Sequence, residues 1–257
     1  MYSQDTSQPP SYESCVAALQ EPVLLVLAGQ SIRAGSATGP ALYETNRGVA
    51  NLGPATTCVE LTRVERSVRR GGAEEATLTT DEDAKEFGEV EAEDGDVLVT
   101  PRVRVRRRHI MDLVHPTSSG TPPYYVKPWT KQTQQGTWGL KKAYGLRRWR
   151  VLRVLEKGRY GEPAFVDEEE EERKRPLFCV GKAHGGAYEW TDAHGERLAR
   201  EEQDRGKKEY SLTTVRAMGR DEMDALVAMW CCRIWEAAAA AQPPIHEGME
   251  KGKRNKT

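Results

Sequence analysis

Residues 224–241 read DALVAMWCCRIWEAAAAA and are apolar on almost every side of a helical projection. A helix without a polar face must be covered all round, either by protein or by lipid. Many short strand-like segments precede this helix in the chain, and they are the covering that the chain itself offers. We therefore predict that the helix is the buried centre of a β-rich fold.

The charges of this helix favour a protein core over a membrane. A membrane-spanning helix needs about 20 mostly apolar residues, whereas Arg233 and Glu236 interrupt this one. Each such charge at mid-bilayer costs on the order of 2.5 to 3.5 kcal/mol on insertion scales. Asp221 and Asp224 lie in the expected first turn, where the helix dipole favours carboxylates, and Pro243 follows the end. We expect that the chain is not an integral membrane protein.

The residues before the helix show the two-residue alternation of strands. Residues 97–105 are the clearest example, because their valines alternate with Arg102 and Arg104. The segment 188–199, YEWTDAHGERLA, predicts a hairpin whose turn uses the side chain of Asp192 and the left-handed conformation of Gly195. Many short strands followed by one helix predict a mainly β fold, an antiparallel closed or nearly closed barrel around the C-terminal helix. Further strand-like runs lie at residues 23–28, 41–43, 57–64, 110–114, 124–127, 138–141, 149–155, 177–181 and 210–215.

The remaining segments are too polar to join a core. Residues 1–20 and 242–257 are predicted to be a disordered arm and a disordered basic tail, because they carry too little apolar surface to offset ordering. Residues 71–96 hold eleven acidic residues against one lysine. With residues 167–172 they are predicted to be acidic loop insertions in a single domain that spans residues 21–241.

Composition indicates where in the cell the protein is expected and which partners are not expected. The 257 residues include 38 basic and 39 acidic side chains, so there is no surplus positive field and no nucleic acid is expected as a partner. The five cysteines are scattered and odd in number, which favours reduced thiols over a disulfide framework. The first thirty residues lack the basic start and apolar run of a secretory signal. We therefore expect a cytoplasmic protein.

Five stretches of this chain, taken in order, resemble a known family. They are VLLVLAGQSIRAGSATGPALYE (23–44), RRHIMDLVHP (107–116), TWGLKKAYGLRRWRVLRV (137–154), RPLFCVGKAHGGAYEWTDAHGERLA (175–199) and RDEMDALVAMWCCRIW (220–235). Across about residues 21–241 the chain is similar to uncharacterised fungal proteins of the tubby C-terminal-like superfamily, which also holds LURP-one-related proteins and phospholipid scramblases. The resemblance implies an antiparallel barrel of about twelve strands threaded by a hydrophobic C-terminal helix. It implies no single activity, because the superfamily has none.

The best short motif is Pro9-Pro10-Ser11-Tyr12, a PPxY sequence in the polar arm. Two prolines favour a polyproline II strand, which suits the aromatic grooves of WW domains, and Tyr12 fills the neighbouring pocket. Pro9, Pro10 and Tyr12 are therefore predicted to bind a WW-domain protein such as a ubiquitin ligase of the Nedd4 type. The alternative is a flexible proline-bearing arm. A second match, at residues 122–125, runs into a strand-like stretch and is interpreted as barrel wall.

An alternative function rests on arginines that alternate along two strands. Alternate strand residues project on one side about 6.6 Å apart, a spacing that suits lipid head groups. The competing interpretation is that these arginines pair with the acidic insertions or keep the sheet soluble. The predicted anionic-lipid face consists of Arg102, Arg104, Arg106, Arg108, Arg148 and Arg150.

No catalytic or metal motif is evident. The five histidines are dispersed, no cysteine or histidine pair has zinc spacing, and there is no nucleophile elbow, phosphate loop or dinucleotide fingerprint. We expect no cofactor, no metal and no enzymatic activity. The sequence thus predicts a non-catalytic interaction module that presents a WW ligand, with peripheral binding of anionic lipid as the alternative.

Overall fold

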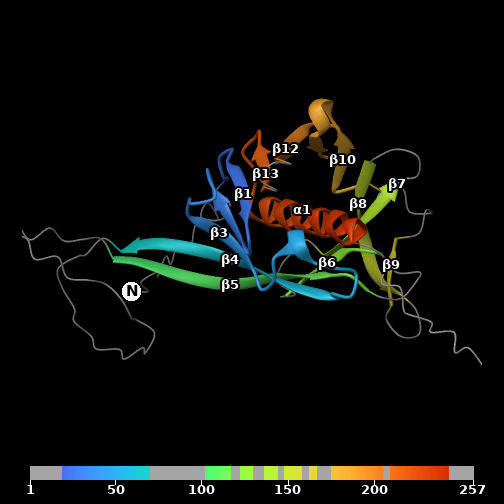
Figure 1. Ribbon diagram of the computed structural model, residues 1–257, viewed down its shortest axis with the longest axis horizontal. Helices are drawn as coiled ribbons and strands as arrows, with labels where there is room; N and C mark the ends of the chain where they lie inside the picture. Colours follow the sequence, from blue (N-terminus) through green and yellow to red (C-terminus); the bar gives the residue numbers. More distant parts are fainter. Residues whose placement is uncertain are drawn as a thin grey trace, which may run out of the picture.

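The computed structural model describes residues 19–69, 102–116, 122–129, 136–143, 148–157, 162–166, 175–204 and 209–242. These residues form strands and one long helix (Figure 1). The strands are β1 (Leu24–Ala28), β2 (Ser31–Ala34), β3 (Ala41–Thr45), β4 (Cys58–Arg69), β5 (Arg102–Val114), β6 (Tyr125–Pro128), β7 (Thr137–Ala143), β8 (Arg148–Lys157), β9 (Glu162–Phe165), β10 (Phe178–Lys182), β11 (Tyr188–Thr191), β12 (Arg197–Asp204) and β13 (Glu209–Thr214). The helix is α1 (Arg220–Ala241), and the short 3-10 turns η2 (Val49–Asn51) and η4 (His184–Gly186) lie between strands.

The strands form a closed antiparallel barrel. Starting from β10, the order runs through β11, β12 and β13 to β1 and then along the chain to β8. The ring of twelve strands closes because β10 pairs with the first half of β8, where Cys179 lies opposite Arg150. The second half of β8 pairs with β9, which lies outside the ring. The predicted fold class is confirmed.

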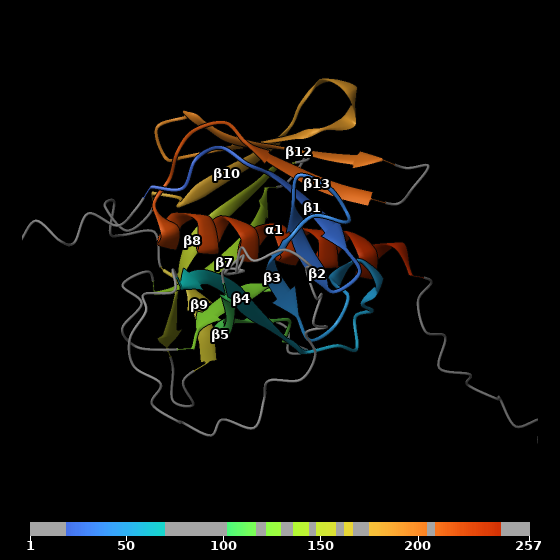
Figure 2. The same cartoon turned by 90° about the vertical axis from the view of Figure 1, so that its left-hand side faces the viewer.

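Helix α1 lies within this barrel (Figure 2). Every residue from Met223 to Trp235 is buried, so the helix has no exposed face over more than three turns. Four large apolar side chains of the helix are fully buried among the inward residues of the strands. They are Leu226, Val227, Trp230 and Ile234. The helix begins four residues before the predicted stretch, at Arg220.

Arg233, the charge in the middle of the helix, finds its partner on the barrel wall. Its guanidinium forms an ion pair with Glu201 of β12, and both side chains are buried. Its Cζ also lies 4.6 Å from the centre of the Tyr188 ring. Burial lowers the pKa of Arg233 to about 10, because the charged form loses water. A buried charge without such partners would be strongly destabilising, so the pair restricts how the helix sits in the barrel.

The predicted 188–199 hairpin is confirmed as β11 and β12. The Oδ1 atom of Asp192 accepts hydrogen bonds from the backbone N–H groups of His194 and Glu196, at 2.8 and 2.9 Å. Gly195 adopts the left-handed conformation with φ of 85°, as the turn requires. The second PPxY match also lies where predicted, because Tyr124 is only 5% exposed and belongs to the core.

The predicted strands differ from the structure in one informative place. Residues 97–105 and 110–114 were expected to be two strands, whereas residues 102–114 form the single strand β5, and residues 97–101 lie outside the described part. The exposed arginines 106–108, which lie between the two predicted strands, continue the ladder of β5. Strands β2 and β9, each of four residues, were not predicted.

Several predicted segments fall outside the described residues. They are the acidic insertions 71–96 and 167–172, the tail from 243 onward, and the arm up to residue 18. Gln20, at the end of the predicted arm, pairs with Met218. Among the described residues, no helix is both long enough and apolar enough to cross a bilayer.

The dependence of the barrel on its central helix gives a first prediction. Leu226→Ala should lower the free energy of unfolding by about 2 to 5 kcal/mol, because it leaves a cavity at a fully buried position. Leu19→Ala is the matched control, since Leu19 is 65% exposed, and it should change stability by less than about 0.5 kcal/mol. Urea unfolding followed by tryptophan fluorescence measures both. Equal effects of the two substitutions would contradict the central position of the helix.

Candidate functional site

The two longest strands of the barrel continue past their neighbours. Strand β3 pairs with β4 only as far as Arg63, opposite Tyr43. On the other side, β6 pairs with β5 only from Met111 onward. Strands β4 and β5 stay paired with each other to Arg69 and Arg102, so they leave the barrel as a two-stranded ribbon (Figure 1).

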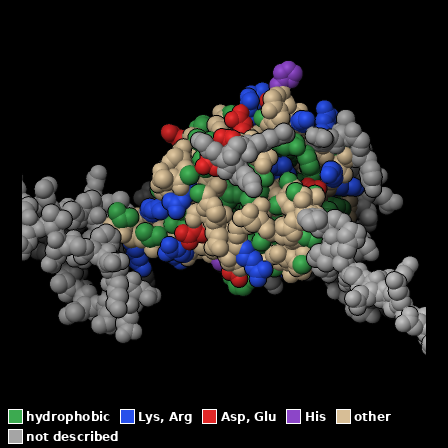
Figure 3. Space-filling view, in the orientation of Figure 1, with side chains coloured by type: hydrophobic (Ala, Val, Ile, Leu, Met, Phe, Trp, Pro, Cys, Tyr) green, Lys and Arg blue, Asp and Glu red, His purple; other side chains and the backbone are tan. Residues whose placement is uncertain are grey.

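A groove with a volume of about 1100 Å³ lies where this ribbon leaves the barrel, beside the N-terminus of α1. Basic and hydrophobic side chains gather on the projecting ribbon (Figure 3). Among the described residues that line the groove, two are carboxylates, Glu21 and Glu65, and six are arginines, so this lining carries more positive than negative charge. The basic lining residues are Arg63, Arg66, Arg104, Arg106, Arg107 and Arg220.

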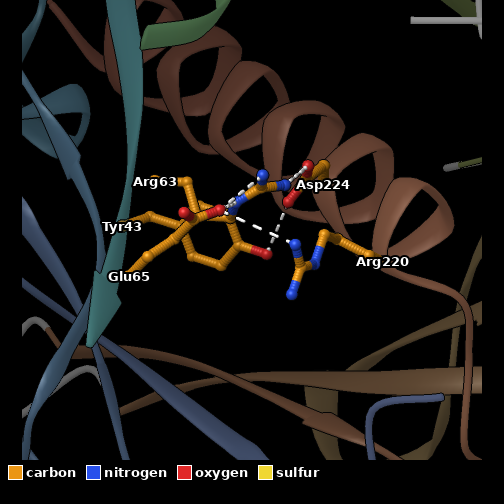
Figure 4. Close-up of polar contacts among 5 residues, drawn as sticks. All are labelled: Tyr43, Arg63, Glu65, Arg220 and Asp224. Carbon is orange, nitrogen blue, oxygen red and sulfur yellow. Dashed lines mark hydrogen bonds and ion pairs between the residues drawn. The ribbon is translucent and has the colours of Figure 1, made fainter. Parts of the chain in front are cut away.

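The floor of the groove is a buried polar cluster that joins β3, β4 and α1 (Figure 4). The Arg63 guanidinium donates to Asp224 through Nη1 and to Glu65 through Nη2, the latter at 2.8 Å. The Tyr43 hydroxyl donates to the other oxygen of Asp224 at 2.9 Å. Arg220 lies 3.7 Å from Glu65. The donors of Arg63 are therefore largely committed to two carboxylates of the chain.

Burial is the largest single cause acting on the pKa of each acidic group in this floor. Burial raises the pKa of Asp224 to about 6, although Arg63 and the Tyr43 hydrogen bond oppose the shift. The pKa of Tyr43 is raised well above its ordinary value, first by burial and then by the charge of Asp224. For Glu65, burial acts to raise the pKa, but the hydrogen bond and charge of Arg63 outweigh it, so the pKa is lowered. Glu65 thus stays an anion at the edge of the groove.

Two exposed arginines lie higher on the ribbon, and one of them, Arg106, lies opposite Glu65 and helps to lower the pKa of that carboxylate. Arg104 and Arg106 are exposed and form no hydrogen bond or ion pair with any residue that the structure describes. Two other arginines are engaged: Arg107 bonds Glu44 at 2.9 Å, and Arg66 donates to the carbonyl of Ala41 at 2.6 Å. Exposed guanidinium groups suit phosphate and carboxylate ligands, which they bind through two parallel N–H donors.

The structure separates the arginines that were predicted to share one lipid-binding face. Arg104 and Arg106 line the groove, whereas Arg108 is exposed on β5 outside the groove lining. The side chain of Arg102 lies outside the described residues, although its backbone belongs to β5. Arg148 and Arg150 are exposed on β8, which β6 and β7 separate from β5 in the sheet, and they do not line the groove. The WW-ligand residues Pro9, Pro10 and Tyr12 lie outside the described part.

Several groove residues were not singled out from the sequence. Arg63 and Glu65 lie within or next to a predicted strand, but nothing local shows that they face a helix more than 150 residues later. Arg220 precedes the predicted helix and reaches the groove only because the helix enters the barrel beside β4. The available signal was the alternation of charged residues at 63, 65, 104 and 106, which matches one face of a paired ribbon.

Comparisons with known proteins assign no family to this chain. No family model, no curated protein and no solved structure matches this chain. Within the described ranges, no group of three or more histidine, cysteine, aspartate or glutamate side chains is placed to hold a metal ion. The chemistry that the groove offers is the binding of an anion by arginine.

The buried carboxylate of Asp224 gives a prediction about pH. Its pKa is raised from 3.8 in the unfolded chain to about 6, so the folded state holds the proton more tightly. Its contribution to stability is therefore full below pH 3.8 and is lost as the pH rises through about 6. The difference in unfolding free energy between wild type and Asp224→Asn should fall across this window, by an amount on the order of 3 kcal/mol.

Urea unfolding at a series of pH values measures this difference. Asp221→Asn is the matched control, because it removes an exposed carboxylate from the same helical turn, and its difference should fall less than that of Asp224→Asn. A difference that rises with pH for Asp224→Asn would mean that the ion pair with Arg63 outweighs burial.

Proposed function

We propose that this protein is a non-catalytic peripheral membrane protein that binds anionic lipid head groups in the groove between the ribbon and the barrel. The observation that carries the proposal is the described lining of the groove, which holds six arginines and two glutamates. Two of the six, Arg63 and Arg107, also pair with Asp224 and Glu44 outside the lining. Arg104 and Arg106 supply the contacts, because neither bonds to a described residue. Each basic residue near an anionic membrane surface contributes about 1 kcal/mol of binding.

The groove suits a surface more than a small buried ligand. Val105 also lines it and is 46% exposed, and Val103, at 47% exposure, lies on the same face of β5 as Val105. Exposed valines next to arginines match the boundary between lipid head groups and acyl chains.

A barrel with a central C-terminal helix also supports membership of the tubby C-terminal-like superfamily, which we propose on the resemblance of the sequence.

Charge reversal at the groove tests lipid binding. Arg104→Glu/Arg106→Glu should weaken binding to vesicles of phosphatidylcholine and phosphatidylserine at low salt by at least about tenfold. Arg148→Glu/Arg150→Glu is the matched control, because it reverses two exposed arginines with the same spacing on another strand, and it should bind like wild type. Sedimentation with vesicles measures both, and vesicles of phosphatidylcholine alone give the background.

Equal loss in the two double variants would mean that net charge, not the groove, attracts the protein. A wild-type protein that does not sediment with the anionic vesicles at low salt would remove the proposal.

A second proposal rests on the Pro9-Pro10-Ser11-Tyr12 motif, which makes the chain a ligand of a WW-domain protein. Tyr12→Ala should abolish capture by an array of WW domains, because the tyrosine fills the pocket beside the proline groove. Ser11→Ala is the control and should bind as well as wild type, since the motif leaves that position open. Capture that survives in Tyr12→Ala would contradict the proposal.

A further inference from the structure

One edge of strand β5 has no neighbouring strand among the described residues. Residues 102–109 pair with β4 on one side. On the other side, the pairing with β6 begins at Met111, and the backbone bond from Trp129 N–H to the carbonyl of Ile110 continues it by one residue. An edge of this kind presents a row of backbone donors and acceptors that match an added strand.

The side chains along this edge alternate between two chemistries. Val103 and Val105 are exposed on one face, which they share with Arg107, an arginine already bonded to Glu44. On the opposite face the exposed arginines 104, 106 and 108 follow the same two-residue spacing. At the barrel end of the edge, Trp129 is 61% exposed and stacks on His109 with ring centres 4.3 Å apart. Exposed tryptophans held by a neighbouring ring are typical anchors of protein interfaces.

The charges of these side chains determine which kind of strand can pair with the edge of β5. A second copy of this chain would place its own arginines opposite Arg104 and Arg106, and like charges directly opposite each other destabilise a strand pair. An extended segment with acidic side chains on one face and apolar side chains on the other would instead meet the arginines and the valines together. Charge complementarity therefore favours a foreign acidic strand over self-pairing.

We propose that the free edge of β5 binds an extended segment of a partner protein in which acidic and apolar residues alternate, by addition of a strand to the ribbon. The backbone of β5 supplies the hydrogen bonds, which are not sequence-specific. The two faces fix the register, because a slip by one residue would move the acidic side chains from the face of Arg104, Arg106 and Arg108 to the face of Val103 and Val105. Trp129 marks the end at which an apolar residue of the partner packs.

The proposal is independent of lipid binding, although both use Arg104 and Arg106. Arg108 and Trp129 do not line the groove, so variants at these two positions separate the edge from the lipid site. Arg108→Glu and Trp129→Ala are both exposed substitutions, and thermal unfolding checks that each variant folds. Arg150→Glu is the control for a charge reversal on an exposed strand elsewhere.

Fluorescence anisotropy of the full chain with labelled synthetic peptides tests the edge. A peptide of alternating Glu and Val, as long as the free edge, should bind at least about tenfold more tightly than a peptide of the same composition with its residues in two blocks. Arg108→Glu and Trp129→Ala should each weaken binding of the alternating peptide by about tenfold, whereas Arg150→Glu should not.

N-methylation of the peptide distinguishes strand addition from attraction of charge alone. Only every second N–H of an added strand points toward the edge, so methylation at one set of alternate positions should abolish binding and methylation at the other set should not. Equal binding of the alternating and block peptides, or equal effects of the two methylated sets, would overturn the proposal. Failure of the alternating peptide with retained binding to anionic vesicles would overturn the edge while leaving the lipid site intact.

Discussion

The complete burial of a helix without a polar face is the constraint on which this structure depends. From Met223 to Trp235 no side chain of α1 is exposed, so a single sheet face, which covers one side of a helix, would leave the other side in water. The ring of twelve strands, closed by the pairing of β10 with β8, covers the helix all round. Closure also removes the sheet edges that an open sheet of this size would expose.

Two charged residues of the helix turn this apolar packing into a specific arrangement. Asp224 bonds Arg63 and Tyr43 at one end, and Arg233 pairs with Glu201 further along. An apolar helix alone would tolerate rotation or sliding inside the barrel, whereas each misplaced charge would lie buried without a partner. The two pairs lie on different strands of the wall, β4 and β12, and so they define both the depth and the rotation of the helix.

The candidate site exists because β4 and β5 are longer than the strands that flank them. Because β4 and β5 continue past β3 and β6, their arginines leave the core and surround an open groove. Arg63 links the two regions, since one side of its guanidinium holds Asp224 of the core helix and the other holds Glu65 at the groove. The same extension leaves the outer edge of β5 without a strand neighbour in the described part of the chain.

The sequence by itself determined the helix, the strand-rich wall, the β11–β12 hairpin and the burial of Tyr124, because hydrophobic periodicity and turn chemistry are local. It also indicated that Arg104 and Arg106 share one face of a strand. Only the tertiary structure decided that the arginines of β8 lie outside the groove, and that Arg63 and Arg220 both line it. The physical reason is that strand order and strand length depend on which segments pair, and pairing between distant segments leaves no periodic signal in either one.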